Sequence, residues 1–189
     1  INVPWSEGEV PGAPWGATNA VLNYDYVDPA LAGTPGLAYA LSEDGNSYEC
    51  TGIGTCAETD IEIGAIHKNL PVTAVAERAF SGNQTPKSVT IPANITTIGK
   101  RAFSTTSITS LKIEENGQPL SIGQEAFLFL FLNTLSLPSR VTEIGYYAFQ
   151  NCSQLTEVLS TGSAAIFNGT FKQCGKLTSV TISTGATVL

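Results

Sequence analysis

The chain has 189 residues, of which 42% are hydrophobic, and its formal net charge is −7 with nine lysines and arginines. This length suits one domain with a continuous core. Nucleic-acid binding rests on clustered cations, and a membrane span needs about 20 apolar residues, whereas the longest apolar run here, residues 126–132, has seven. We therefore expect neither nucleic acid as a partner nor membrane insertion of this segment.

The chain starts at Ile1 and contains no methionine and no signal-like segment, so we expect a processed or partial chain. It has four cysteines and four N-x-[ST] sequons. Both features are typical of the secretory route. They predict an extracellular or cell-surface protein.

Residues 1–36 are rich in proline and glycine and form an expected arm or linker, in which residues 21–27 alternate as a strand does. One interpretation is a mobile linker. The other is an extended arm that adds a strand to a neighbouring molecule or lays its tryptophans on it. The candidate interface residues of the arm are Trp5, Trp15, Tyr24 and Tyr26.

Residues 37–69 are expected to form a β-hairpin cap and a first strand. Asp44-Gly45 supplies the positive φ that a tight hairpin turn requires. Cys50 and Cys56 flank the loop that follows, and a disulfide there would staple the cap. His67, the single histidine, is interpreted as a surface-turn residue.

Residues 70–189 repeat one phrase, best seen as Ile-Gly-x-x-Ala-Phe. Its phenylalanines, Phe80, Phe103, Phe127, Phe149 and Phe171, follow each other at 23, 24, 22 and 22 residues. A second phrase, apolar-x-apolar, keeps a similar period at Val89, Leu111, Leu135, Val158 and Val180. Two sets of residues that keep the same period predict a solenoid of about five coils. One unit of this length cannot bury its own apolar face, whereas stacked units bury a shared one.

Within each coil, the apolar-x-apolar phrase predicts a short parallel strand. In the other phrase, Ile98, Ala102 and Phe103 lie at i, i+4 and i+5. This spacing predicts a short helix on the outer face, with Gly99 easing its entry. The expected fold is an α/β solenoid with strands on one face and short helices or turns on the other.

Residues 135–156, "LSLPSRVTEIGYYAFQNCSQLT", resemble the BspA-like class of leucine-rich repeats, and the resemblance extends over about residues 37–189. It implies a curved, right-handed and non-enzymatic solenoid of secreted or surface proteins, used for adhesion and protein contacts and opened by a hairpin. The departures at Asn83, Pro86 and Phe167 affect local loop geometry.

No constellation for catalysis or metal binding emerges from the sequence. His67 lacks a nearby nucleophile or orienting group, and Asp25 and Asp28 lack the ligand spacing of a calcium loop. We expect no enzyme and no cofactor.

Cys152 and Cys174 occupy the same coil position, so they are expected about 5 Å apart on neighbouring rungs. That spacing permits a disulfide, but small buried thiols suit the inward position better, and the resemblance implies the same use. Asn94, Asn151 and Asn168 are expected to be exposed and open to N-linked glycan, whereas Asn83 is expected to face the core or a tight turn.

Two surfaces compete as partner sites. The outward strand row, Thr90, Lys112, Ser136, Leu159 and Thr181, is rich in hydroxyls, and a solvated face is the favoured interpretation. Leu128, Phe129 and Phe131 lie where the next coil has Gln150, Asn151 and Ser153. Burial of each large apolar side chain releases roughly 1.5–3 kcal/mol. We therefore predict that another chain or the arm covers them.

The expected function is cell-surface adhesion or ligand binding through protein contact, with a host or matrix protein or a copy of the chain as partner. The alternative is a structural subunit that assembles head to tail into a filament or layer through the arm and an open solenoid end. Residue 189 falls where a further coil would begin, and an uncovered end exposes an unpaired strand.

Overall fold

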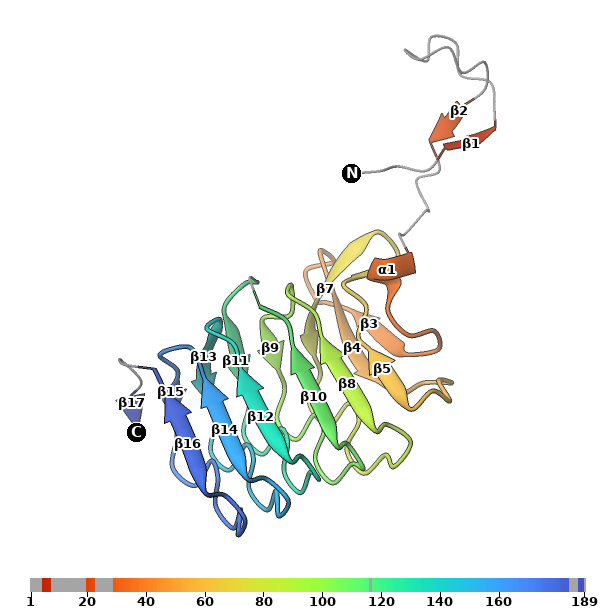
Figure 1. Cartoon of the computed structure of the whole chain (residues 1–189). Coiled ribbons are helices and arrows are strands. Elements are labelled where there is room, and N and C mark those ends of the chain that lie inside the picture. The colour runs from red at the N-terminus through yellow and green to blue at the C-terminus, as the bar shows by residue number, and fades with distance from the viewer. Residues whose placement is uncertain (1–4, 8–19, 23–28, 116, 184–186, 189) are drawn as a thin grey trace.

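The computed structural model describes residues 5–7, 20–22, 29–115, 117–183 and 187–188. Residues 29–183 form a solenoid in which each coil contributes one strand to a front face and one to a back face (Figure 1). Trp15, Tyr24 and Tyr26 lie outside the described residues.

The front face consists of β5 (Asp60–Glu62), β8 (Ser88–Ile91), β10 (Ser110–Ile113), β12 (Thr134–Leu137), β14 (Glu157–Ser160) and β16 (Ser179–Ile182). The back face consists of β7 (Leu70–Val75), β9 (Thr97–Ile98), β11 (Leu120–Ile122), β13 (Val141–Ile144), β15 (Ala165–Ile166) and β17 (Thr187–Val188). The remaining elements are β1 (Trp5–Glu7), β2 (Ala20–Leu22), α1 (Pro29–Ala32), β3 (Ala38–Leu41), β4 (Tyr48–Gly52) and β6 (Ile66–His67).

Neighbouring coils pair in parallel on both faces, but the front face is interrupted. Its strands form two three-stranded sheets, β5–β8–β10 and β12–β14–β16, with no ladder between β10 and β12, while the back strands form one sheet with the hairpin. Among the described residues, six strands on each face make six coils, where the sequence predicted about five. The additional front strand is β5, which was expected to belong to the cap region. No Ile-Gly-x-x-Ala-Phe phrase precedes β5. In that coil, β4 and the turn that follows β4 stand where the phrase stands in the other coils.

Of the short helices or turns expected on the outer face, the structure has turns: within residues 37–115 and 117–183 the Ala-Phe phrases form no helix. In an α-helix each amide donates to the carbonyl four residues earlier. Here the Phe103 amide donates instead to Ala126 of the next coil at 2.8 Å, while the Ala102 amide closes a local turn onto Gly99. Arg101 has a φ of 55°. A residue in the left-handed region interrupts an α-helix. The Ala-Phe segment therefore forms a turn, and the turns of neighbouring coils stack through hydrogen bonds between them.

The phenylalanines of the repeat form one stack through the core. Ring centroids of successive residues lie 4.9, 5.3, 5.1 and 5.7 Å apart along Phe80, Phe103, Phe127, Phe149 and Phe171, with nearly parallel planes. The first four of these rings are fully buried. The repeat period therefore fixes both the backbone ladder and the aromatic core.

The N-terminal end of the solenoid is covered by the chain itself. The hairpin β3–β4 pairs with β7, and Gly45 in its turn has a φ of 73°. Beside it, the Thr34 amide donates to the Glu62 carbonyl and the Thr34 hydroxyl accepts from the Glu62 amide. These bonds satisfy the outer edge of β5, which would otherwise be free to pair with another chain.

Replacement of Gly123 by alanine tests the close approach of adjacent coils. A Cβ atom there would lie 2.8 Å from the Ile98 carbonyl oxygen and 2.9 Å from the Lys100 amide nitrogen. Since both contacts are backbone, we expect a loss of about 1–3 kcal/mol in the free energy of unfolding, measured with urea. Gly175→Ala is the control, because nothing lies within 4 Å of its Cβ position. Equal urea midpoints for the two variants would contradict this account of the repeat glycine.

Candidate protein-contact site

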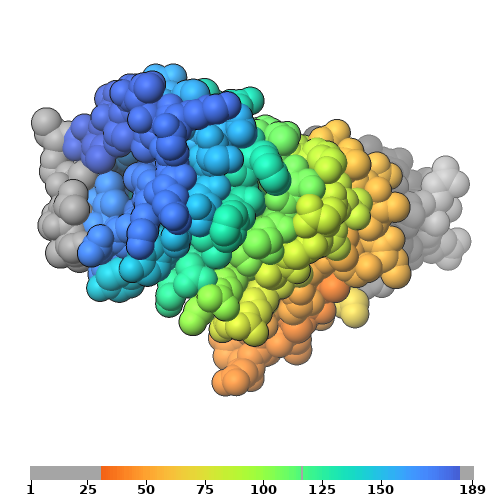
Figure 2. All heavy atoms as spheres, turned by 90° about the horizontal axis from the view of Figure 1, so that it is seen from below, coloured from red at the N-terminus to blue at the C-terminus, as the bar shows by residue number. Residues whose placement is uncertain are grey.

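Each coil has a return loop, which leads from the phenylalanine of the repeat to the next front strand. Two of these loops are one residue shorter than the others. The first apolar residue of the front strand follows Phe103 and Phe127 by eight positions, but follows Phe80 and Phe149 by nine. These loops form the lower edge of the molecule, and Figure 2 shows that edge as successive bands of coils. A shorter loop reaches less far outward, so the edge can be hollowed at these coils.

An open hollow of about 300 Å³ lies at this point of the lower edge. It is lined by Gln84, Thr105, Thr106, Phe129 and Phe131. The two phenylalanines are 48% and 49% exposed, which is unusual for such large apolar side chains. We call this feature the Phe129–Phe131 hollow.

Phe129 is also held in a strained backbone conformation, with a φ of 62°. The corresponding residues in the coils on either side, Thr105 and Asn151, have φ values of 56° and 60°. Asparagine tolerates this left-handed region, whereas a bulky residue pays about 1–2 kcal/mol for it. The chain therefore keeps a large aromatic ring at an exposed position that disfavours it, which is a pattern typical of functional sites.

Leu128, which was expected to need cover from another chain or the arm like Phe129 and Phe131, is half-buried within the chain itself. Its carbonyl accepts the Thr105 amide at 2.7 Å, and this bond ties it to the preceding coil. The Phe131 amide likewise donates to the Ile108 carbonyl at 3.0 Å. The exposed part of the apolar run is thus the pair Phe129 and Phe131, on a backbone fixed to the preceding coil.

The wall of the hollow opposite the rings is polar and is itself ordered. The Gln84 side-chain amide donates to the carbonyls of Gly82 and Thr105, and its oxygen accepts from the Ser107 hydroxyl. Lys87 donates to the Gln84 carbonyl at 3.3 Å. These groups hold the wall in place and leave the hydroxyl oxygen of the exposed Thr105 able to accept a further hydrogen bond, whereas Thr106 is buried.

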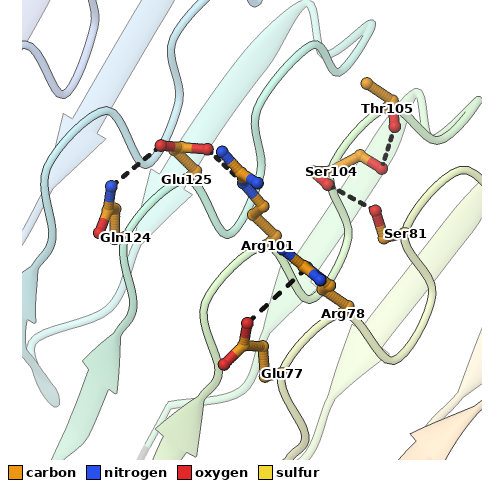
Figure 3. A network of polar contacts seen from close by, with 8 residues as sticks. All are labelled: Glu77, Arg78, Ser81, Arg101, Ser104, Thr105, Gln124 and Glu125. Carbon is orange, nitrogen blue, oxygen red and sulfur yellow. Dashed lines mark hydrogen bonds and ion pairs between the residues drawn. The ribbon is translucent and has the colours of Figure 1, made fainter.

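A polar network on the outer turns joins the same coils (Figure 3). Arg101 points to Glu125 of the next coil, and its hydrogen bond to that carboxylate holds the pKa of Glu125 below the usual value. The Ser81 and Ser104 hydroxyls lie 2.8 Å apart. Exposed ion pairs contribute little stability, so the network serves chiefly to fix the turns that precede the hollow.

The outward strand row is regular but divided. Lys112, Ser136, Leu159 and Thr181 are exposed and Thr90 is half-buried. The interruption between β10 and β12 separates the first two members of the row from the last three. Leu159, which is 43% exposed, is the one large apolar side chain of the five. The row offers mostly small polar groups, spread over two separate sheets.

The sequons differ in accessibility. Asn94, expected to be exposed, is half-buried, and its side-chain nitrogen donates to the Ala65 and Val72 carbonyls, so that nitrogen is not free to carry a glycan. The Asn83 side chain accepts the Thr85 amide in a tight turn. Asn151 is half-buried and Asn168 is exposed.

All four cysteines are free thiols, which differs from the disulfide expected between Cys50 and Cys56. Cys50 points into the core from β4, and burial raises the pKa of its thiol to about 12. Cys152 and Cys174 lie in the core, where their sulfurs donate to the Phe127 and Phe149 carbonyls. The neighbouring thiol of Cys174, together with burial, raises the pKa of Cys152.

His67 is not on an open turn, as the sequence suggested, but on strand β6 against the cap. Its ring stacks on Tyr39 at 4.4 Å and meets Tyr48 edge-on at 4.7 Å, and burial lowers its pKa. Within the described residues no three histidine, cysteine or acidic side chains gather as a metal site. The same residues include no helix with the length and apolarity for crossing a membrane.

The sequence interpretation missed a second aromatic group. Tyr146 is 49% exposed and lies 4.9 Å from Phe167, while Lys172 lies 5.7 Å from the ring of Tyr147. The signal was the pair of tyrosines at positions where the neighbouring coil has Gln124 and Glu125. The polar wall of the hollow was also missed, since its residues come from two neighbouring coils, and the phenylalanines that face it come from a third.

In the arm, β1 pairs antiparallel with β2, so that Trp5 lies opposite Leu22. The described strand ends at Leu22, and the remainder of the predicted strand at residues 21–27 lies outside the described residues.

Comparison with known families identifies one match. The family described as BspA type leucine rich repeat region matches residues 54–159 and 118–189, with six copies of the repeat. The two ranges together cover more than two thirds of the chain. No curated protein has a significant match to the chain.

Several solved bacterial structures share the fold. A leucine-rich repeat protein of T. pallidum is 24% identical, with a TM-score of 0.59 over 77% of this chain and 79% of its own. The pneumococcal vaccine antigen PcpA is 20% identical, with a TM-score of 0.62 over 81% of this chain and 46% of its own. A leucine-rich cell surface protein of Faecalibacterium prausnitzii is 23% identical, with a TM-score of 0.50, over 83% and 54%. The chain thus spans about half the length of the last two.

Proposed function

Because this chain belongs to the BspA-type leucine-rich repeat family, we propose that it is a non-enzymatic extracellular module that binds another protein at the cell surface through the Phe129–Phe131 hollow. Repeats of this family are in general scaffolds for protein contact and typically have no catalytic role. Adhesion or ligand capture is the role we assign to this chain.

One observation carries the proposal: two large aromatic rings stand about half exposed around a hollow, one of them on a left-handed residue. Aromatic anchors in a pocket with a polar rim are the usual centre of a protein interface. The strand row lacks such anchors and is divided between two sheets. Two structural neighbours, a vaccine antigen and a cell surface protein, support the extracellular assignment.

A binding assay tests the proposal. The chain is immobilised and titrated with purified extracellular matrix and host surface proteins, with Phe129→Asn/Phe131→Ser as the variant and Leu159→Thr as the matched control. We expect saturable binding to at least one protein, weakened tenfold or more in the double variant, since two anchors are lost. Leu159→Thr should bind as the parent chain does. Equal binding by all three chains would place the contact elsewhere.

Head-to-tail self-assembly is the second candidate. The observation that favours it is β16, the last strand of its sheet among the described residues, where Val180 is 45% exposed although its counterpart Val158 is buried. An uncovered strand edge is a template for another chain. Electron microscopy of the concentrated protein decides this point: filaments with continuous coils establish assembly, and monomers exclude it.

A further inference from the structure

We propose that the partner of the Phe129–Phe131 hollow is an acidic, extended protein segment that lies along the lower edge, across the coils. It places an apolar side chain in the hollow and pairs carboxylates with Lys87 on one side and Lys176 on the other. This inference rests on the proposed function, because it names the chemistry of the partner that the hollow binds.

The lower edge differs in charge from the rest of the chain. The whole chain has 16 aspartates and glutamates against nine lysines and arginines. Five of its return loops nevertheless carry three lysines, Lys87, Lys172 and Lys176, and no acidic residue. These loops are residues 81–87, 104–109, 128–133, 150–156 and 172–178. The loops around the hollow therefore form a basic surface on an acidic protein, and charge complementarity favours an acidic partner there.

The charges of these lysines are not compensated within the chain. All three side chains are exposed, and among the residues that the structure describes none of them forms an ion pair. The ammonium of Lys87 donates to the Gln84 carbonyl at 3.3 Å, and that of Lys176 donates to the side-chain oxygen of Gln154 at 2.6 Å. An ammonium has three donors. These neutral partners therefore orient the lysines and leave their charge and remaining donors to a carboxylate.

The hollow between these lysines suits an apolar side chain. No charged side chain lines it, and its two phenylalanine rings are about half exposed. The Gln84 side chain is already bonded to neighbouring groups and Thr106 is buried, so the polar wall has few groups left for a ligand. Large apolar or aromatic side chains that fill such a site are the usual anchors of a protein interface.

The spacing along the edge sets the pattern of the partner segment. Lys87 precedes β8, Phe131 precedes β12 and Lys176 precedes β16, so two coils separate Phe131 from each lysine. Neighbouring strands lie about 4.8 Å apart, which puts each lysine roughly 10 Å from the hollow along the edge. An extended chain advances about 3.3 Å per residue, so the matching segment has an acidic residue about three positions before and after its apolar anchor.

Fluorescence anisotropy with labelled peptides tests the proposal on the full-length chain. The probe is the capped peptide Gly-Asp-Ser-Ser-Trp-Ser-Ser-Asp-Gly. One control peptide has lysine in place of both aspartates, and the other has alanine in place of the tryptophan. We expect saturable binding of the probe at low salt and an affinity about tenfold lower or less for each control peptide. Because salt screens exposed charges, the affinity for the probe should also fall as the salt concentration rises.

Variants of the chain locate the contact. Lys87→Glu/Lys176→Glu should weaken probe binding about tenfold or more. Lys68→Glu/Lys112→Glu is the matched control, because it changes the net charge equally at two exposed lysines, one just before β7 and one on β10. It should weaken binding less than about threefold. In Phe129→Asn/Phe131→Ser, the tryptophan and alanine peptides should bind equally. Circular dichroism of each variant checks that the solenoid remains folded.

Three results would each overturn the proposal: no binding of the probe up to about 1 mM, equal affinity for the aspartate and lysine peptides, or equal effects of the two pairs of lysine substitutions. None of them affects the assay with purified proteins. A protein that binds through Phe129 and Phe131 without dependence on salt or on the lysines would retain the proposed function and refute the acidic segment.

Discussion

Arg140→Ala should lower the free energy of unfolding by about 3–5 kcal/mol, one of the two largest single-residue effects expected in this chain. Arg140 is only 6% exposed, and its guanidinium donates to four backbone carbonyls, those of Pro92, Ile95, Glu114 and Gln118, at 2.6–3.0 Å. Burial lowers its pKa, but arginine remains charged at any working pH. Removing it leaves the Ile95, Glu114 and Gln118 carbonyls without this donor, and each such loss costs about 1–3 kcal/mol. The Pro92 carbonyl keeps the Ile95 amide as a donor at 3.3 Å.

The reason for this arrangement lies in a two-residue insertion. The segment from Ile113 to Gly123 is two residues longer than the segment from Ile91 to Gly99 that it stacks on, so its carbonyls fall out of register with the amides of the neighbouring coils. Arg140 donates to the Glu114 and Gln118 carbonyls of this segment, and also to the Pro92 and Ile95 carbonyls of the coil before it. At the equivalent position two coils earlier, the Asn94 side chain donates to the Ala65 and Val72 carbonyls.

Two variants make the Arg140 prediction specific. Arg101→Ala removes an arginine whose side chain is 39% exposed and paired with Glu125, and we expect a loss of less than about 1 kcal/mol. Arg140→Lys keeps the charge but cannot reach four acceptors with one ammonium, so it should be intermediate. Urea denaturation followed by circular dichroism measures all three. A loss at Arg140→Ala no larger than at Arg101→Ala would show that solvent satisfies the carbonyls.

The repeat period was sufficient to predict the solenoid, the inward phenylalanine column and the register within each of the two front sheets, but not the break between β10 and β12. Leu135, for example, pairs with Val158, and Val158 with Val180, as the spacing indicated. Such features follow from side-chain burial at fixed intervals, and the sequence displays burial directly.

The outer helices could not be excluded from the sequence in the same way. The spacing of Ile98, Ala102 and Phe103 fits one helical turn, but it fits stacked turns equally well. The difference lies in where the Phe103 amide donates, which is to Ala126 in another coil. Propensity and periodicity describe one segment at a time, whereas this hydrogen bond depends on two coils.

The sequence predicted the aromatic residues of the candidate site but not its polar lining. Phe129 and Phe131 were identified because the equivalent positions of the next coil are polar. Gln84 and Thr105 were not identified, since each is an ordinary loop residue whose place in the hollow depends on the shorter return loops. The disulfide expected between Cys50 and Cys56 is absent for a related reason. The two residues are close in sequence, but β4 directs Cys50 into the core.

Phe127→Ala should cost about 3–5 kcal/mol and should also split the unfolding transition. Phe127 is fully buried and stacks on Phe103 at 5.3 Å and on Phe149 at 5.1 Å. Phe127 lies in the coil of β12, and β12 forms no backbone hydrogen-bond ladder with β10 of the preceding coil. The front face is therefore divided into two halves at this coil. The phenylalanine stack and the back sheet therefore carry most of the coupling between the two halves. In a solenoid, cooperativity depends on such interfaces between neighbours.

Phe149→Ala is the matched control, because it deletes the same ring from the same stack where β12, β14 and β16 are joined by front-strand ladders. It should lose similar stability yet unfold in one transition. For Phe127→Ala, hydrogen exchange should show residues 134–183 opening before residues 60–113, with a reduced urea m-value for each step. A single transition with an unchanged m-value would mean that the back sheet alone couples the halves. Two transitions in both variants would mean that any break in the aromatic stack divides the solenoid, whatever the front strands do.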